Sequence, residues 1–399
     1  MRKISRRDFI KGLCSLGLCA LGGGTLLSCA RSEEPTPTSA PNLPPNAREA
    51  MYYRRVGEGL VQCQLCPNRC TLSDGMRSPC RVRENRGGKL YTLVYGNPCA
   101  VHNDPMEKKP FFHFFPSSLA FSIATAGCNL HCLYCQNWTI SQRPPEETEN
   151  LDLPPEKVVE YALKAGSQSI AYTYSEPTIF YEYMLDVAKV ARARGLKNVV
   201  VSAGYMNPEP LKELCRAVDA IKIDLKGFNE DFYERVCFAR LEPVLETIKT
   251  IYEEGVHLEI VNLVVPSLND NEEELRELAR WIVKNVGPDV PTHFSRFFPM
   301  YKLKDLPMTP VESLEKARKV AMEEGLHYVY IGNVPGHPGT HTYCPNCGRV
   351  IIRRMGFAVV ENHIVEGKCE YCGNLIPGVW GPVSAHPEGA GQFKERERE

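Results

Sequence analysis

The amino-acid sequence predicts an α/β protein whose central domain is a partial or full (β/α) barrel, flanked by two small cysteine-rich modules. Between residues 116 and 335, apolar runs alternate with helical patterns, which is typical of parallel strands joined by crossover helices. The stretch 127–138, GCNLHCLYCQNW, carries three closely spaced cysteines near the start of this region. Most of the other cysteines, among 17 in all, gather in groups before and after the central domain.

The alternating region predicts seven strands and the helices between them. A helix over 154–165 stops at Gly166, and a helix over 271–284 begins with Asp270 and Glu273 as a capping pair. Residues at the carboxyl ends of the strands are then expected to converge near the cysteine loop, which follows the first strand. The strands are expected near residues 119–126, 168–174, 198–203, 219–224, 257–264, 292–297 and 327–332.

The three cysteines of the loop, Cys128, Cys132 and Cys135, have C-x3-C-x2-C spacing. One short loop can therefore turn three thiolates towards a common point. Such a tripod suits three irons of a 4Fe-4S cluster and leaves the fourth iron without a protein ligand, so that it can bind a small molecule. An ordinary zinc knuckle is the alternative that this motif alone leaves open.

Two further groups of four cysteines are predicted to bind metal, because close C-x2-C pairs in a large chain are more typical of metal ligands than of disulfides. The N-terminal group suits a closed tetrahedral zinc site, and an additional iron-sulfur cluster is the alternative. The C-terminal group consists of two C-x2-C-G knuckles and predicts a zinc ribbon. The two groups are Cys63, Cys66, Cys70 and Cys80, and Cys344, Cys347, Cys369 and Cys372.

The N-terminal segment has the features of a targeting signal, with basic residues followed by an apolar, glycine-rich run. Residues 5–11, SRRDFIK, resemble a twin-arginine signal read by the Tat translocon. Residues 26–29 resemble a lipobox, which would make Cys29 the site of a lipid anchor. We therefore expect export to the periplasmic face or anchoring in the membrane. The alternative is an uncleaved signal on a protein that faces the cytoplasm.

Composition divides the chain into six segments. They are the signal segment 1–29, a proline-rich tether 30–48, a four-cysteine metal-binding module 49–115, the barrel domain 116–335, a zinc-ribbon-like module 336–384 and a disordered tail 385–399.

Polar residues stand at the ends of several predicted strands. Singly, each could be a hydrogen-bonded loop residue or a helix cap, but together at one end of a sheet they indicate a site. The residues are Ser175 and Glu176 after the second strand, Ser202 at the third, Asp224 and Lys226 at the fourth, and Asn262 and the run 293–297, HFSRF, in later strands. Before the barrel, Lys108, Lys109 and His113 could face a substrate, whereas the neighbouring phenylalanines are expected to pack.

The tripod, with Tyr134 as an aromatic residue before its last cysteine, resembles the signature of radical S-adenosylmethionine (SAM) enzymes. Five more motifs, DPMEKKPFFHF, YTYSEPTIFYEYM, IKIDLK, HFSRFFP and YIGNVPGH, stand in this order with it, behind a C-x2-C-x3-C module. As a set they closely resemble the radical SAM member of the AmmeMemoRadiSam group, which is related to pyruvate formate-lyase activating enzymes. The resemblance covers about residues 55 to 380.

The resemblance implies a barrel of the radical SAM type and a 4Fe-4S cluster that chelates SAM. An electron from an external donor would cleave SAM to a deoxyadenosyl radical, which abstracts hydrogen from an unknown substrate, either a glycyl-radical-type protein or a small molecule. Glu176 corresponds to the acid that helps to hold the methionine amino group, although the Gly-Gly that often precedes this acid is here Tyr174-Ser175. We interpret Glu176, Asp224 and Lys226 as catalytic. The cofactor-binding residues are interpreted as Cys128, Cys132, Cys135, Tyr134, Ser175, Glu176, Ser202 and Asn262.

Two other classes of protein fit parts of the sequence. An iron-sulfur electron carrier without SAM chemistry would need a fourth cysteine near the tripod, for which Cys99 is the candidate. A metal-stabilised binding scaffold would present a basic face beside the ribbon, where Arg349, Arg353 and Arg354 lie. No nucleic-acid partner is expected, since 47 basic residues balance 48 acidic ones. Export also conflicts with SAM chemistry, because SAM and low-potential electron donors are supplied in the cytosol and an exported enzyme would lack a source of both.

Overall fold

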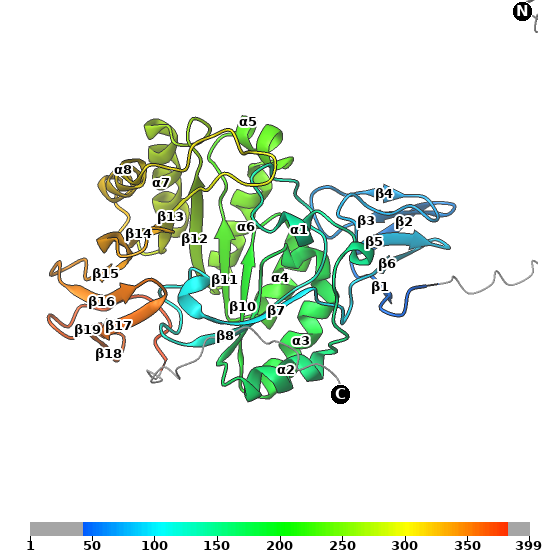
Figure 1. Cartoon of the computed structure of the whole chain (residues 1–399), viewed down its shortest axis with the longest axis horizontal. Coiled ribbons are helices and arrows are strands. Elements are labelled where there is room, and N and C mark those ends of the chain that lie inside the picture. Colours follow the sequence, from blue (N-terminus) through cyan, green and yellow to red (C-terminus); the bar gives the residue numbers. More distant parts are fainter. Residues whose placement is uncertain (1–42, 382–399) are drawn as a thin grey trace, which may run out of the picture. The chain divides into compact units, whose positions relative to one another are not determined.

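An eight-stranded sheet forms the centre of the computed structural model, which describes residues 43–381 (Figure 1). The strand order is β14-β13-β12-β11-β10-β9-β8-β7, so strands that follow one another in the chain are also neighbours in the sheet. All of them pair in parallel except β7, which runs antiparallel to β8. The bounds are β7 Ala100–Pro105, β8 Leu119–Ala124, β9 Ser169–Tyr172, β10 Lys197–Ser202, β11 Ala220–Asp224, β12 His257–Val264, β13 Thr292–Arg296 and β14 Val329–Gly332.

The parallel strands β8 to β14 are the seven predicted strands, and each lies within a residue or two of its predicted range. Their buried faces explain the agreement, because a parallel sheet covered on both sides requires continuous apolar runs. The sheet is open, since β14 and β7 are its two edge strands, so the full barrel among the two predicted forms is not observed in residues 43–381. Strand β7, which lies within the range 49–115, hydrogen-bonds to β8 along its whole length.

Six helices connect the parallel strands. Each buries an apolar face against its neighbours; α7, for example, buries Leu275, Leu278 and Ile282. The six are α2 Pro155–Lys164, α3 Tyr181–Ala193, α4 Pro208–Ala217, α6 Glu242–Glu253, α7 Glu272–Val286 and α8 Val311–Glu323. The remaining helical elements, inside this domain and next to it, are short: η1 Met106–Lys108, α1 Trp138–Ser141, η2 Pro145–Glu147, η3 Pro177–Phe180, α5 Glu230–Phe232, the π-helix η4 Tyr233–Cys237 and η5 Pro338–Thr340.

The start of α7 differs from the predicted capping pair. Asn271 is the cap, and its side-chain oxygen accepts hydrogen bonds from the backbone N–H groups of Glu273 and Glu274, at 2.9 and 3.3 Å. Asp270 instead accepts from the N–H of Ser267 at 2.8 Å, which closes the preceding turn. The prediction of Asp270 and Glu273 as a capping pair is therefore wrong, because the helix begins one residue later than the pair requires.

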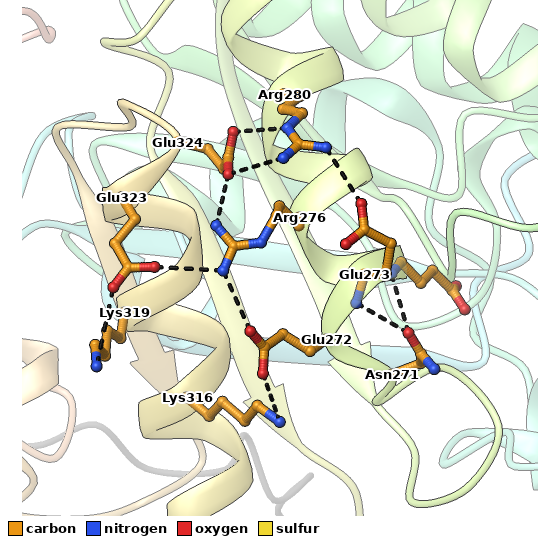
Figure 2. Close-up of polar contacts among 10 residues, drawn as sticks. Asn271, Glu272, Glu273, Arg276, Arg280, Lys316, Lys319, Glu323 and Glu324 are labelled. Atoms are coloured by element: carbon orange, nitrogen blue, oxygen red, sulfur yellow. Dashed lines mark hydrogen bonds and ion pairs between the residues drawn. The ribbon is translucent and has the colours of Figure 1, made fainter.

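Ion pairs join α7 to α8, and their two central residues, Arg276 and Glu324, are half-buried, as Figure 2 illustrates. Arg276 pairs with Glu324 at 2.6 Å, Glu272 at 3.2 Å and Glu323 at 3.4 Å. Arg280 pairs with the same Glu324 at 2.8 Å. Single exposed ion pairs stabilise little, but a network in which one carboxylate serves two arginines contributes more than an isolated pair. This network lies on the outer helices and has no part in the site described below.

Small antiparallel sheets build the two cysteine-rich modules. In the N-terminal module the strands are β1 Arg48–Glu49, β5 Arg83–Arg86 and β6 Lys89–Thr92 in one sheet, and β2 Tyr53–Gly57, β3 Leu60–Cys63 and β4 Thr71–Leu72 in another. In the C-terminal module they are β15 Thr342–Tyr343, β16 Val350–Met355 and β17 Ala358–Asn362, with β18 Ile364–Val365 and β19 Lys368–Cys369 apart.

The C-terminal module is fastened to the barrel domain by Arg354, which is fully buried. Its guanidinium donates to the carbonyl of Phe112 at 2.9 Å and lies 3.9 Å from the centre of the Phe112 ring. Arg353 pairs with Glu361, and Arg349 lies over the ring of Tyr371. The basic face predicted for a binding scaffold is therefore not formed by all three arginines, because Arg354 faces the interior.

Several predictions concern residues outside the part that the structure describes. These are the signal segment 1–29 with Cys29, most of the tether 30–48, and the tail 385–399. Within residues 43–381, no helix has both the length and the apolar composition that crossing a membrane requires.

The cap of α7 is open to a direct stability test. We expect Asn271→Ala to lower the free energy of unfolding by about 1 kcal/mol, because two helix N–H groups lose their acceptor. Asp270→Ala is the matched control and should cost less, since it removes one exposed turn hydrogen bond. Urea denaturation of both variants measures the difference; an equal or larger loss for Asp270→Ala would contradict the assignment of the cap.

Candidate functional site

A cavity of about 560 Å³ lies at the carboxyl ends of the parallel strands, within the size range of small-molecule and cofactor sites. Parallel strands with crossover helices present their ligand sites at this edge, because the connecting loops converge there. Eight of the ten residues interpreted as catalytic or cofactor-binding line the cavity: Cys128, Cys132, Tyr134, Cys135, Ser175, Glu176, Asp224 and Lys226. Ser202 and Asn262 are not among the lining residues. Each hydrogen-bonds to a strand-end loop that carries lining residues: Ser202 to Glu176, and Asn262 to the carbonyl of Leu225.

The three tripod cysteines lie in the irregular loop between β8 and α1, and all three are free thiols. The N–H of Leu130 points to the sulfur of Cys128 at 3.4 Å, and the hydroxyl of Ser141 lies 3.1 Å from the sulfur of Cys135. Burial raises the pKa of the Cys128 and Cys135 thiols. Thiolates in such surroundings need a bound metal to hold their charge, so this donor set fits a metal centre.

Cys237 is an unpredicted neighbour of the tripod. It ends the π-helix η4, and its sulfur lies 3.5 Å from the Tyr134 hydroxyl. Among the described residues, neither Cys237 nor Cys99 lines the cavity, so neither stands beside the tripod as a fourth ligand on that wall. Local sequence gives no indication of this contact, because more than a hundred residues separate Cys237 from Tyr134.

Glu176 ends the strand-end loop after β9, and the protein surrounds its carboxylate with donors. One oxygen accepts from the N–H and the hydroxyl of Thr178, at 3.2 and 2.7 Å, and from the hydroxyl of Ser202 at 2.6 Å. The other oxygen accepts from the N–H of Ala203 at 2.8 Å and keeps room for a further donor. Ser202 therefore positions Glu176. The buried hydroxyl of Ser175 lines the cavity and has no partner among the described residues.

Asp224 lies between two lysines at the end of β11. It accepts hydrogen bonds from Lys222 and, at 2.9 Å, from Lys226. Burial alone would raise the pKa of Asp224, but the two cations outweigh it and lower that pKa to about 2. Lys222 was not predicted, although a lysine inside a buried strand, two residues from Asp224 and so on the same face, was a usable indication. Asn262 donates to the carbonyl of Leu225 and supports this turn.

A buried carboxylate, Glu259, connects the far wall of the cavity to the segment before the barrel. It accepts from the N–H groups of Phe112 and His113, at 3.0 and 2.8 Å, and from the rings of His257 and His293. His293 lines the cavity, whereas the ring of His113 is buried against the Tyr330 hydroxyl at 2.6 Å. The suggestion that His113 faces a substrate is therefore wrong, because its ring serves packing.

The lysines of the same segment do reach the cavity. Lys108 and Lys109 line it, and both are paired with Asp104, at 2.8 and 2.5 Å. Glu107 also lines the cavity and is buried; one oxygen accepts from the N–H of Ser117 at 2.9 Å and the other has no partner in the described residues. Burial raises the pKa of Glu107 to about 7, although Arg354 opposes the change.

The two groups of four cysteines differ in geometry. In the C-terminal group, all four sulfurs lie within 4.8 Å of one another, with 3.6 Å between Cys344 and Cys372 and 3.9 Å between Cys347 and Cys369. A tetrahedron of sulfurs at zinc-sulfur bond lengths has edges of about 3.8 Å, so these thiols fit one metal ion. Within residues 43–381, the N-terminal cysteines do not gather this closely, and the predicted closed zinc site is not confirmed there.

Comparison with known proteins adds to this geometry. Residues 122–282 match the model of the radical SAM superfamily. An uncharacterized protein of Methanocaldococcus jannaschii is 50% identical over 331 residues, which are 82% of this chain and 98% of that protein. The pyruvate formate-lyase-activating enzymes of Clostridium pasteurianum and Staphylococcus epidermidis are each 24% identical, over 50% and 54% of this chain and 87% and 91% of theirs. A solved domain of such an enzyme from Bacteroides vulgatus has a TM-score of 0.37 at 18% identity, over 42% of this chain and 100% of that chain.

The raised pKa of Glu107 predicts a pH effect on stability. Between its ordinary pKa of 4.5 and about 7, the folded state keeps the proton that the unfolded state has lost, so this group stabilises less as pH rises. Glu107→Gln resembles the protonated form at every pH. We expect the stability of Glu107→Gln relative to the unmodified protein to increase from pH 5 to pH 8. Urea denaturation across this range measures it, and a difference that is independent of pH would refute it.

Proposed function

We propose that this chain, which belongs to the radical SAM superfamily and is homologous to pyruvate formate-lyase-activating enzymes, is itself a radical SAM enzyme. The observation that carries the proposal is the presence of the three tripod thiols and the Ser175-Glu176 loop on the walls of one cavity. Cys128, Cys132 and Cys135 would hold a 4Fe-4S cluster. When bound and reduced, that cluster supplies the electron that cleaves the sulfonium C–S bond of SAM, giving methionine and a deoxyadenosyl radical.

The residues of the chain would bind and orient SAM beside the tripod. Glu176 offers a carboxylate oxygen that has one donor, from Ala203, and Ser175 offers a free hydroxyl; both suit the ammonium and carboxylate groups of the methionine part. Tyr134 packs between Phe232 and Phe297, with ring centres 6.1 and 6.5 Å away, and so excludes water from the tripod. Asp224 keeps its charge because Lys222 and Lys226 hold it, and it would contact either SAM or the substrate.

The substrate would be a glycyl-radical-type protein or a small molecule from which hydrogen is abstracted. The first class follows from the homology to activating enzymes, and the AmmeMemoRadiSam system is the setting that the sequence motifs favour. An external one-electron donor is a further partner. We also propose export through the Tat translocon and a lipid anchor at Cys29, on the strength of the N-terminal motifs alone.

For the C-terminal group we propose a structural zinc ion. Its four ligands would be Cys344, Cys347, Cys369 and Cys372, whose sulfurs have the spacing of one tetrahedral site. Four thiolates leave no open position on the metal, so the ion would stabilise the module and take no part in the reaction. The module in turn supplies Gly356 and Phe357 to the wall of the cavity.

SAM cleavage is the direct test of the enzyme. After anaerobic reconstitution with iron and sulfide and chemical reduction, we expect the full chain to convert SAM to methionine and deoxyadenosine, measured by chromatography. Cys132→Ala should abolish both products, because it removes a cluster ligand. Cys99→Ala is the matched control and should retain them. If the cluster is loaded and reduced but yields neither product, the proposal is refuted, and an iron-sulfur electron carrier becomes the favoured function.

The zinc proposal is tested by metal analysis. We expect Cys347→Ser to lower the zinc content by about one ion per chain and to lower the melting temperature, because the ribbon loses the metal that folds it. Cys215→Ala, a buried cysteine of α4 outside all three groups, is the control. Unchanged zinc in Cys347→Ser would overturn the assignment.

A further inference from the structure

We propose that Cys63, Cys66, Cys70 and Cys80 bind a second iron-sulfur cluster, placed directly beside the tripod loop. The proposal concerns a site outside the cavity and goes beyond the proposed function. It rests on the arrangement of the four thiols, on the contacts between their loops and the tripod loop, and on a buried cation among them.

The four cysteines are free thiols brought together by one small fold. Cys63 ends β3, and its N–H donates to the carbonyl of Cys70 at 3.0 Å, while the N–H of Arg69 donates to the carbonyl of Cys66 at 3.1 Å. The thiol of Cys66 interacts electrostatically with the other three. Cys63, Cys66 and Cys70 have C-x2-C-x3-C spacing, which is the tripod spacing in reverse order, and Cys80 adds the fourth ligand that makes a closed cluster site.

The spacing of the sulfurs favours an iron-sulfur cluster over zinc. One zinc ion draws all four thiolates to a single point, as the C-terminal thiols are drawn together at 3.6 to 3.9 Å. A cluster binds each thiolate through a different iron and so keeps the sulfurs farther apart. Within residues 43–381, only the C-terminal group converges to within 4.8 Å. No three of the N-terminal thiols meet this limit, and neither do the three tripod thiols, so both groups lack the compact arrangement of a one-ion site.

The two cysteine loops are in direct contact. Gly127, the residue before Cys128, has a φ of +90°, and a Cβ at this position would lie 2.5 Å from the carbonyl oxygen of Cys80 and 2.6 Å from the side chain of Val82. Only glycine permits this approach of the two backbones. Beside this contact, the side chain of Asn68 donates to the carbonyl of Asn129 at 3.0 Å. The site of the second cluster is thereby fixed next to the loop that carries the first.

A buried guanidinium supplies positive charge to the site. Arg83 is 2% exposed and pairs with Glu182 at 2.8 Å, yet its Nε has no partner among the described residues. Arg83 interacts electrostatically with Cys63 and Cys80. One carboxylate neutralises its charge before any thiol is ionised, but a cluster with four thiolate ligands adds negative charge and a sulfur acceptor. The arginine then has a second function, which is to stabilise the bound cluster.

The adjacency suits a one-electron relay. An external donor of the ferredoxin or flavodoxin class would reduce the N-terminal cluster by one electron, and the tripod cluster would gain the electron that the N-terminal cluster then gives up. This role rests on the proposed function. Binding of the second cluster does not rest on it, because none of its four ligands belongs to the tripod.

The test uses the full chain with Cys128, Cys132 and Cys135 all replaced by alanine. After anaerobic reconstitution, we expect this triple variant to retain acid-labile sulfide, about half of the wild-type iron, and an electron paramagnetic resonance signal after reduction. In addition, about one zinc ion should remain, in the C-terminal group. A triple variant that holds two zinc ions and neither iron nor sulfide would overturn the proposal.

A second variant assigns the cluster to its ligands. Cys66→Ser combined with Cys80→Ser, in the triple-variant background, should abolish the remaining iron and sulfide, whereas Cys215→Ala in the same background should leave both unchanged. Iron and sulfide that survive Cys66→Ser with Cys80→Ser would overturn the assignment. In the unmodified protein, the two signals should broaden and relax faster than either cluster alone, since the loops are in contact. Independent signals would contradict the adjacency. None of these readouts uses SAM, so failure of SAM cleavage would leave the result standing.

Discussion

The site depends on hydrogen bonds that hold the irregular cysteine loop by its backbone. The loop lies between β8 and α1 and has no regular structure of its own, so its shape comes from its neighbours. Leu133 donates to the carbonyl of Val236 at 2.9 Å and accepts from Lys302 at 2.9 Å, while the side chain of Asn129 donates to the carbonyl of Tyr205 at 2.9 Å. Three thiolates can act together only if they are fixed in advance, and segments from across the barrel domain share that task.

Buried charge is the second constraint on the cavity. Asp224 with its two lysines, Glu259 with two histidines, and Glu107 near Arg354 all lie at or behind the cavity wall. Charges withdrawn from water are costly unless they are paired and hydrogen-bonded, so the pairs of Asp224 and of Glu259 oppose movements of the wall that would separate them. Arg354 comes from the C-terminal module, which also supplies Gly356 and Phe357 to the wall. A metal that stabilises the ribbon would therefore affect the cavity without taking part in its chemistry.

The three groups of cysteines show how geometry separates sites that look alike in sequence. Closely spaced thiols, as at Cys344 and Cys372, fit one ion. Within residues 43–381, the sulfurs of the tripod and of the N-terminal group do not all lie within 4.8 Å of one another, as those of the C-terminal group do. The contact of Gly127 with Cys80 joins the N-terminal group to the tripod. Spacing along the chain predicted all three groups as metal sites, but it left zinc and iron-sulfur open for the N-terminal one.

Local patterns in the sequence predicted the seven parallel strands, the tripod and the strand-end residues Glu176, Asp224 and Lys226, because hydrophobic periodicity, apolar runs and short motifs are properties of neighbouring residues. They missed the cap at Asn271, where a shift of one residue decides which side chain reaches the helix N–H groups. Only the tertiary structure showed that the sheet is open, that His113 packs, and that Ser202 positions Glu176. It alone showed that Cys237 contacts Tyr134 and that Cys80 contacts Gly127. These contacts join segments far apart in the chain, and no local pattern specifies which segments will meet.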